Sequence, residues 1–403
     1  MNFNLFSRFS RYALIGFFVL VETSSAGSIF SRRGIGLLRY RDNVRSIGMG
    51  GVGIAVADSI SFYFLNPAGL TRVNLSRIQS NFRYERASVD AVRSASRGLF
   101  HDASVNGLGL AIPVHRRQVF ALGVRPYSMS DFEFSQMAED STFVESLSGS
   151  GGVSELYLAY AVNFGRLQAG VTADFYFGRL NRIWRLNYFS RDFNNSEDVI
   201  NRHFTGIGLH AGVQTQVGRW QLGAATGLPT PLNVRTELNT IFGSNEKRQE
   251  GELKLPVWWG AGVGYAPNRH WLLSADYRTQ RWNSVKAEEL LGAIGVNSHD
   301  FSFGGEFIPS FDALEGYFKR MSYRFGANYK RLPYEETGGT KVSQWTMNLG
   351  FGLPFGRGYN RIDFAAEFGK RGDLADNAAE ENIVLIHVAV IGSERWFQRP
   401  KRR

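Results

Sequence analysis

The sequence predicts an all-β protein, a transmembrane antiparallel β-barrel of about 14 strands with an N-terminal hatch, or plug, that contains short helices. Apolar residues alternate with polar or small ones through most of the chain, and short turns alternate with long polar connections. No stretch is long enough to cross a bilayer as a helix. In lipid, a chain with these features can pair all of its backbone hydrogen-bonding groups only by closing into a barrel. A soluble secreted sandwich is the alternative.

Residues 1–26 are expected to be a secretory signal peptide. Arg8 and Arg11 precede the apolar run from Tyr12 to Val21, and Ser24 to Ala26 offer small residues for cleavage. The run is too short for a membrane helix, which takes ~20 residues. We therefore expect export and localisation in the bacterial outer membrane.

Residues 27–75 are expected to form the hatch. A glycine-dense run ends at Asp58, an apolar segment follows, and Asn66 and Pro67 then have the character of a helix cap and a first helical position. The residues expected to form the hatch and ligand path are Gly48, Gly50, Gly51, Asp58, Phe62, Phe64, Asn66, Pro67, Ala68 and Gly69. Phe62 and Phe64 either line an apolar path or simply pack against the wall.

Residues 76–397 are expected to form the barrel, followed by a basic tail at 398–403. From Leu156 to Phe164 the side chains alternate with a period of two, and the same period recurs downstream. Short turns are expected at 115–117, 165–166, 218–219, 267–270 and 355–360, and long polar loops at 92–102, 133–150, 190–202, 233–250, 287–298, 331–339 and 371–381. This asymmetry is typical of outer-membrane barrels, whose periplasmic turns are short. An aromatic girdle is expected from Trp220, Trp271, Trp282 and Trp345.

Polar side chains on the other face of these segments are expected to point into the lumen. They are Arg125, Glu155, Asp174, His210, Asp276, Arg278, Arg324, Asn328, Asp363 and Glu367. Charges shut away from lipid must pair or meet water, so their mixed signs predict a hydrogen-bonded interior around a plug. They either guide the polar head of a ligand or only hold the hatch to the wall.

Composition and motifs give little support for catalysis. The 403 residues include 45 Gly and 32 Phe but no Cys, which excludes disulfides, thiolate metal sites and a Cys nucleophile. No zinc-protease, nucleophile-elbow or P-loop motif is present, so we expect no enzyme, no catalytic residue, no metal and no cofactor. The net charge of +10 is scattered, which indicates a solvated surface or anionic head groups rather than nucleic acid.

The run from Met49 to Asp58, followed by Asn66-Pro67-Ala68, resembles the hatch of FadL-type outer-membrane transporters of long-chain fatty acids and other hydrophobic compounds (OmpP/FadL/TodX-like), including their PorV-like and uncharacterised branches. The close of the chain, with Arg395-Trp396-Phe397, resembles their last strand. Where many relatives carry two consecutive acids, this chain has Asp58 and Ser59.

The resemblance implies passive uptake of fatty acids or aromatic hydrocarbons through a plugged barrel, with the segment around Asn66, Pro67 and Ala68 moving to let ligand pass. The expected partners are hydrophobic small molecules and outer-membrane lipid. PorV-like relatives imply an alternative, a protein-binding scaffold or shuttle for a periplasmic or secretion-system protein, and a purely structural barrel is a third. Transport predicts a continuous apolar channel with a lateral gap in the wall, whereas a scaffold predicts a sealed lumen and an exposed apolar patch on the loops.

Overall fold

The computed structural model describes residues 27–41, 43–91, 94–115, 117–138, 142–190, 192–240, 243–285, 291–292, 295–336, 339–356 and 358–394. The expected signal peptide and basic tail lie outside the described residues, as does Arg395-Trp396-Phe397.

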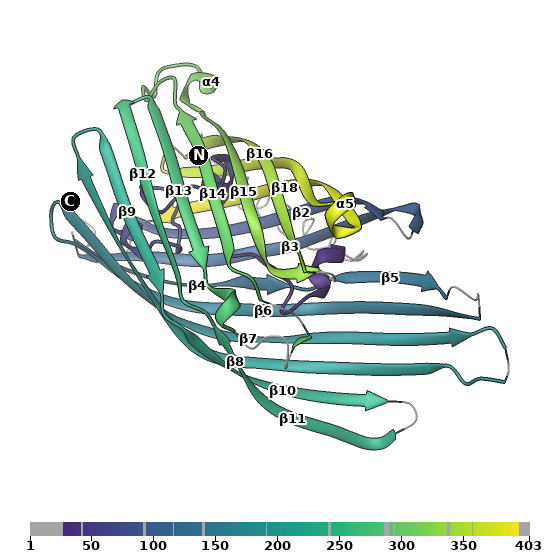
Figure 1. Ribbon diagram of the computed structural model, residues 1–403. Helices are drawn as coiled ribbons and strands as arrows, with labels where there is room; N and C mark the ends of the chain where they lie inside the picture. The colour runs from purple at the N-terminus through teal and green to yellow at the C-terminus, as the bar shows by residue number, and fades with distance from the viewer. Residues whose placement is uncertain are drawn as a thin grey trace, which may run out of the picture.

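The strands form one closed antiparallel barrel of fourteen crossings (Figure 1), as the sequence predicts. The first wall strand, β2 (Ser76–Ala91), pairs with the last, β18 (Ala379–Glu394). This ladder is continuous from Ala379 opposite Ala91 to Glu394 opposite Ser76, so the sheet has no free edge at its closure.

The other wall segments follow one another around the barrel. They are β3 (Ser94–His115), β4 (Gln118–Met129), β5 (Phe132–Met137), β6 (Phe143–Asn163), β7 (Leu167–Tyr188), β8 (Ser196–Val217), β9 (Trp220–Gly227), β10 (Thr230–Thr240), β11 (Gly243–Leu255), β12 (Trp258–Asn268), β13 (Trp271–Gln280), β14 (Ser298–Phe307), β15 (Ser322–Glu336), β16 (Thr340–Phe355) and β17 (Asn360–Asp373).

Three crossings are each broken into two segments: β4 and β5, β9 and β10, and β11 and β12. Pro229 and Pro256 lie at the second and third breaks. Proline cannot donate to the ladder, which explains why the strands are interrupted there. The first break, at Ser130 and Asp131, contains no proline, and it lies beside the N-terminal part of the chain.

Helices are short. They are η1 (Ile29–Arg32), α2 (Val44–Gly48), η2 (Pro67–Arg72), η3 (Trp282–Ser284), α4 (Tyr317–Arg320) and α5 (Leu374–Asn377), and β1 (Leu37–Leu38) is a two-residue strand. In the described part of the chain no helix has both the length and the apolar character needed to cross a membrane.

The outward face of the barrel is apolar, with exposed side chains such as Leu158, Leu209 and Met347. Three tryptophans of the expected girdle, Trp220, Trp271 and Trp345, are exposed at 52%, 38% and 45%. The prediction for Trp282 is wrong, because this side chain is fully buried and packs edge-on against Tyr334. It belongs to η3, which follows the end of β13 and turns inward.

Much of the chain expected as long polar loops is strand. The segments β7 and β8 each have 22 residues and β6 has 21, well beyond the ~9–11 that cross a membrane. The regions 92–102, 133–150, 190–202 and 233–250 accordingly contribute mainly to long hairpins. A polar sequence marks where a hairpin leaves the membrane, but paired strands with two solvated faces continue past that point.

Candidate functional site

The N-terminal segment, residues 27–75, lies within the ring of strands, where Figure 1 shows it in purple. Helix α2 contacts β15, β16, β17 and β18, whereas η2 contacts β4, β6, β7 and β8 on the other side of the lumen. The segment therefore bridges two opposite parts of the wall.

Two asparagines shape the segment. Asn43 Oδ1 caps α2 by accepting from the Ser46 backbone at 2.8 Å, and its amide donates to the Phe62 carbonyl. Asn66 Oδ1 caps η2 by accepting from the Ala68 backbone at 3.1 Å, with Pro67 in the first turn. The Asn66 amide also donates to the Ile54 carbonyl at 2.6 Å and to the Val213 carbonyl on β8 at 3.1 Å. The cap therefore also ties η2 to the wall.

Wall side chains bind the backbone of the N-terminal segment directly. The buried Asp276 on β13 accepts from the Gly53 and Ile54 N–H groups, both at 2.7 Å. On β16, the Asn348 amide donates to the Ile47 carbonyl at 2.9 Å and to Glu367 at 2.9 Å. The Gly53 and Ile54 donors, which lie outside any helix or strand, are thereby satisfied inside the barrel.

His210 and Arg125 make two further ties of this kind. The Nε2 of His210 lies 2.8 Å from the Phe64 carbonyl, and its Nδ1 lies 2.6 Å from Asp174. His210 therefore links the Phe64 carbonyl of the N-terminal segment to Asp174 on β7. Arg125 donates to Glu155 at 2.7 Å and to the Tyr40 carbonyl at 3.3 Å.

A ring of six charged side chains joins the N-terminal segment to the wall. Arg45 contacts Glu306 at 2.7 Å and Asp58 at 3.3 Å, and both partners bind a second arginine. Glu306 pairs with Arg324 at 2.8 Å and Asp58 with Arg361 at 2.7 Å. Arg324 and Arg361 then each pair with Asp363 at 2.7 Å, which closes the ring. We call these residues the charge ring; its three cations and three anions balance.

The charge ring holds Asp58 in the ionised form. Burial opposes the charge of Asp58, but Arg361 and Arg45 outweigh burial and lower the pKa of this carboxyl to about 2. Buried ion pairs are costly to form and costlier to break from one side. The ring therefore resists displacement of the N-terminal segment.

A second charged group lies around Tyr40. Its hydroxyl donates to Asp300 at 2.5 Å, and its ring lies 3.7 Å from the Arg278 guanidinium. Arg41 also pairs with Asp300, and Asn328 donates to Asp300 at 2.6 Å. Burial and the neighbouring carboxylate raise the pKa of Tyr40, so it keeps its proton as a donor.

Glycines let the wall and the N-terminal segment touch backbone to backbone. A Cβ on Gly326 of β15 would lie 2.2 Å from the Gly50 nitrogen, and one on Gly50, which has φ +72°, would lie 2.5 Å from the Ala327 and Phe303 carbonyl oxygens. Among the other expected glycines, Gly48 approaches Gly350, Gly51 approaches Arg41, and Gly69 approaches Ala57.

Phe62 and Phe64 pack into an apolar cluster with Leu70, Val73 and Tyr157. The rings of Phe64 and Tyr157 are 3.7 Å apart between centroids. Cavities that border the N-terminal segment are small: one between the segment and Lys330 has a volume of about 60 Å³, and one beside Phe62 about 10 Å³. Neither holds a molecule of fatty-acid size.

The wall opens between β3 and β4. Their ladder runs from the turn at His115 and Gln118 up to Leu108 opposite Val124 and stops there. Beyond this point β3 pairs only with β2, whereas β4 and β5 pair only with β6 on the wall.

Residues of the N-terminal segment occupy this wall opening. Strand β1 pairs with the free edge of β4, with Leu38 opposite Ser128. Arg39 continues the ladder with a 2.8 Å bond to the Tyr127 carbonyl and reaches across to Asp102 on β3 at 2.8 Å. The helix η1, purple in Figure 1, contacts β5 nearby.

An apolar column lies in the lumen next to β1. It joins Ile35 and Leu38 of the N-terminal segment to Tyr127, Trp282 and Leu253. Its other members are Val153, Tyr176, Leu180, Phe204, Leu232, Val234, Leu255, Leu291, Tyr334 and Val285. The column includes Leu38 and Tyr127, which lie at the β1–β4 ladder in the wall opening, and its side chains pack against one another.

Sequence reasoning missed Arg45, Glu306 and Arg361 of the charge ring. A signal was present for the last two, since each falls on the inward phase of its strand, next to the outward Phe307 and Ile362. Arg45 carried no such signal, because its position depends on how the N-terminal segment folds. Among the described residues no group of three His, Asp or Glu side chains is arranged to hold a metal ion.

Comparisons with known proteins agree with this architecture. The model of the BamG family matches residues 10–402. A search of curated proteins finds no significant match. Among solved structures, a Pseudomonas aeruginosa FadL homologue is similar with a TM-score of 0.59 and 12% identity, over 88% of this chain and 98% of that one.

Two toluene transporters are also similar. TodX of P. putida has a TM-score of 0.57 and 14% identity, over 90% of this chain and 99% of that one. TbuX of Ralstonia pickettii has a TM-score of 0.55 and 16% identity, over 91% of this chain and 100% of that one. These similarities confirm the expected FadL-type barrel fold of bacterial outer-membrane channels. These relatives are transporters rather than enzymes.

Proposed function

This chain belongs to the BamG family, and we propose that it is an outer-membrane channel for the passive uptake of hydrophobic molecules, long-chain fatty acids or aromatic hydrocarbons. In this proposal residues 1–26 direct export and residues 27–75 are the plug. Two toluene transporters and a FadL homologue share the fold, which supports this class of ligand.

The observation that carries the proposal is the wall opening between β3 and β4. An apolar solute crosses water poorly, since exposing each CH₂ costs ~0.8 kcal/mol. A path along the apolar column and out through the wall opening keeps such a solute away from water. The column includes Leu38 and Tyr127, which lie beside the opening that β1 fills.

Uptake by this route requires the N-terminal segment to move, because its cavities are too small for a ligand. We propose that β1 leaves the β4 edge while η2, held by Asn66, Pro67 and Ala68, shifts along the wall. The lumen-facing charges hold the plug in its closed position, and the charge ring sets how easily it is released.

A disulfide between β1 and β4 tests this proposal. Leu38 and Ser128 are directly opposite each other in a non-hydrogen-bonded pair, since Arg39 and Tyr127 bond next to them, so their Cα atoms lie ~4.5 Å apart. That separation is within the range of disulfides. The chain has no native Cys to interfere.

We expect oxidised Leu38→Cys/Ser128→Cys protein in proteoliposomes to stop the uptake of labelled oleate or toluene and the reduced protein to restore it. The control is a cysteine pair at Ala366 and Ile386, opposite each other on β17 and β18 where the wall is closed. Replacement of Asn66 and Pro67 is expected to change uptake as well. Unchanged uptake in the oxidised double mutant and in the Asn66 and Pro67 variants contradicts the proposal.

A second candidate is a scaffold or shuttle that binds a periplasmic or secretion-system protein. The closed lumen favours it, as do exposed aromatic side chains on the β7–β8 hairpin: Trp184 is 47% exposed, Phe189 62% and Phe193 61%. Large exposed apolar groups on a projecting hairpin mark protein contacts. If Trp184→Ser/Phe189→Ser/Phe193→Ser removes a co-purifying protein and leaves uptake unchanged, the scaffold role stands beside transport.

A further inference from the structure

The outward face of β12 to β16 is arranged in rows across the strands. One row contains Ala261, Tyr277, Phe301, Tyr329 and Trp345. The next row toward the short turns contains Val263, Ala275, Phe303, Ala327 and Met347. Large rings therefore alternate with alanines on this part of the membrane-facing surface.

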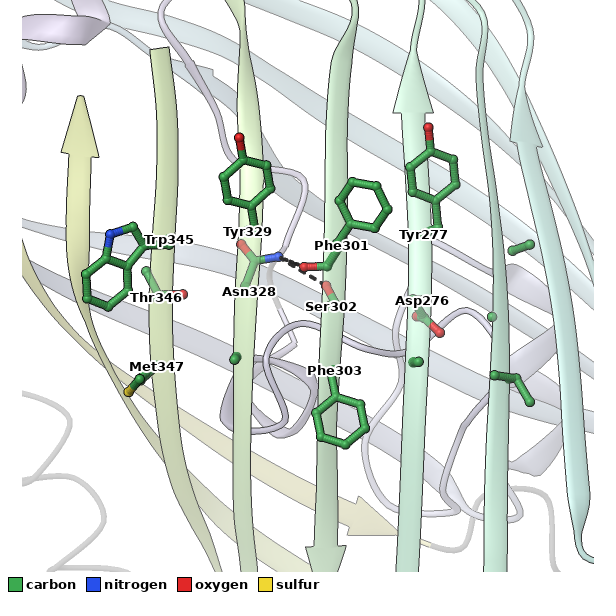
Figure 2. A pocket seen from close by; sticks show the side chains of 15 residues that line it. Asp276, Tyr277, Phe301, Ser302, Phe303, Asn328, Tyr329, Trp345, Thr346 and Met347 are labelled. Atoms are coloured by element: carbon green, nitrogen blue, oxygen red, sulfur yellow. Dashed lines mark hydrogen bonds between the residues drawn. The ribbon is translucent and has the colours of Figure 1, made fainter. Parts of the chain in front are cut away.

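The small side chains leave a hollow of about 680 Å³ (Figure 2). Ala275 and Ala327 flank Phe303, which is 53% exposed, and Gly305 lies two residues along the same strand. From the wall, the Asn328 amide donates to the Phe301 carbonyl at 2.8 Å. This volume lies within the range of small-molecule pockets, ~300–1,000 Å³.

The hollow lies where an aromatic girdle meets a polar row. Figure 2 shows the hydroxyls of Tyr277 and Tyr329 pointing the same way along the strands, away from Phe303. Tyrosines and tryptophans at this level are typical of the membrane–water interface. The part of the hollow beside Phe303 and Met347 therefore faces acyl chains, and the opposite end faces head groups.

Cations follow at that end. The row beyond the tyrosines holds His299 opposite Arg331. A hydrogen bond of 2.8 Å joins the His299 ring to the Tyr277 hydroxyl. Arg331 lies opposite Ser343, and Lys341 is two residues from Ser343 on the same face of β16. Glu335 lies opposite Lys341 across the hairpin. Among the described residues no ion pair involves Arg331 or Lys341, and these two cations with the single carboxylate of Glu335 leave this end of the hollow net positive.

We propose that this hollow binds one phosphorylated membrane lipid, with an acyl chain along Ala275, Phe303 and Ala327 and the phosphate at Arg331 and Lys341. Arginine and lysine near a membrane surface attract anionic head groups. Burial of an acyl chain against rings and alanines adds contact that a flat wall lacks. The inference rests on the barrel spanning a membrane and is independent of transport through its lumen.

The test uses the full chain in nanodiscs of phosphatidylcholine with a minor fraction of phosphatidic acid of the same acyl chains. After mild detergent extraction, native mass spectrometry counts the retained lipids. We expect the wild type to retain one phosphatidic acid in preference to phosphatidylcholine. Arg331→Ala and Lys341→Ala are each expected to lower this preference about fivefold, which is ~1 kcal/mol per cation.

A variant that fills the hollow distinguishes the contribution of its shape to lipid retention from that of the two cations. Ala275→Leu/Ala327→Leu is expected to reduce retention of both lipids. The matched controls are Ala173→Leu, exposed on the outward face of β7, and Lys319→Ala in α4 beside the short turns. Heat-modifiable gel mobility reports that each variant is a folded barrel.

Three results overturn the proposal. They are equal retention of the two lipids by the wild type, unchanged preference after both cations are removed, and unchanged retention after the hollow is filled. A stable dimer that loses its second copy in Ala275→Leu/Ala327→Leu would instead assign the hollow to a second chain. Loss of uptake in the oxidised Leu38→Cys/Ser128→Cys protein affects none of these outcomes.

Discussion

At the scale of single residues, buried charges decide how the N-terminal segment is held. Arg324 and Asp363 have side chains with 0% exposure and are paired at 2.7 Å. Such charges are tolerated in a protein interior only when each has a partner of opposite sign. Asp58 is the anion that the N-terminal segment contributes to the charge ring, and it contacts two arginines.

Asp58→Asn is therefore expected to loosen the N-terminal segment. In the native protein the Ser61 N–H donates to Asp58 Oδ1 at 2.7 Å, and the asparagine keeps an oxygen for this bond. Arg45 and Arg361, however, lose one carboxylate partner. We expect a loss of about 3 kcal/mol in the local opening free energy, or roughly 150-fold faster hydrogen exchange in residues 44–60. The exposed Asp312→Asn is the control. Equal exchange in the two variants would show that the charge ring does not hold the segment.

The charge ring also predicts a pH response. The pKa of Asp58 in the folded protein is about 2, below the value of about 4 in an unfolded chain. The contribution of Asp58 to the stability of the closed N-terminal segment, about 2 kcal/mol, is thus complete above pH ~4 and is lost as the pH falls toward 2.

Planar-bilayer conductance measures this response. We expect conductance to rise between pH 4 and pH 2 in the wild type, as the segment loosens, and to be high and less pH-dependent in Asp58→Asn. Parallel rises in both proteins would mean that another group is responsible.

At the scale of elements, glycines in the strands determine where the N-terminal segment can lie. Gly304 and Gly326 are neighbours on β14 and β15; Gly304 meets the backbone of Met49, and Gly326 meets that of Met49 and Gly50. Without side chains at these two positions, the wall is thin enough for backbone to lie against backbone. The position of the N-terminal segment in the lumen therefore depends on the glycines of these two strands.

Gly326→Val is expected to displace the segment and leave the barrel intact. The new Cβ would lie 2.2 Å from the Gly50 nitrogen, and overpacking of this kind costs ~1–3 kcal/mol. We expect faster exchange around Met49 and higher conductance, with normal heat-modifiable mobility. Gly316→Val is the control, because a Cβ there meets nothing within 4 Å. Wild-type behaviour of Gly326→Val would contradict the close contact.

At the scale of the whole molecule, the barrel and its contents have different sources of stability. The wall is closed by backbone ladders, including the one between β2 and β18. The contents are held by polar ties such as Asp276 to Gly53 and by the charge ring. Lumen side chains that lose these ties meet water, which satisfies them at a small cost.

Deletion of residues 27–75 is therefore expected to leave a folded barrel with a water-filled pore. We expect the deletion variant to keep its β-sheet circular dichroism and heat-modifiable mobility, and to conduct ions many-fold better than the wild type in planar bilayers. The full-length chain is the control. A variant that fails to form a barrel would show that the N-terminal segment is needed for closure.

Much of this architecture follows from the sequence alone. The alternation from Leu156 to Phe164 and its repeats determine the closed barrel, because one face of each strand must meet lipid and the other must not. The same period predicts that Asp276, Arg324 and Asp363 are inward residues, and these side chains are buried. Asn66 and Pro67 mark the start of η2, since a cap is a local interaction.

Tertiary structure alone decides which inward groups meet. The charge ring joins residues from the N-terminal segment, β14, β15 and β17, and no local pattern relates Arg45 to Glu306, 261 residues away. The inward turn of Trp282, the hairpins that continue past the membrane, and the separation of β3 from β4 above Leu108 are likewise set by long-range packing. Periodicity in a sequence reports which face a side chain takes, but the partner on that face depends on the register and closure of the whole barrel.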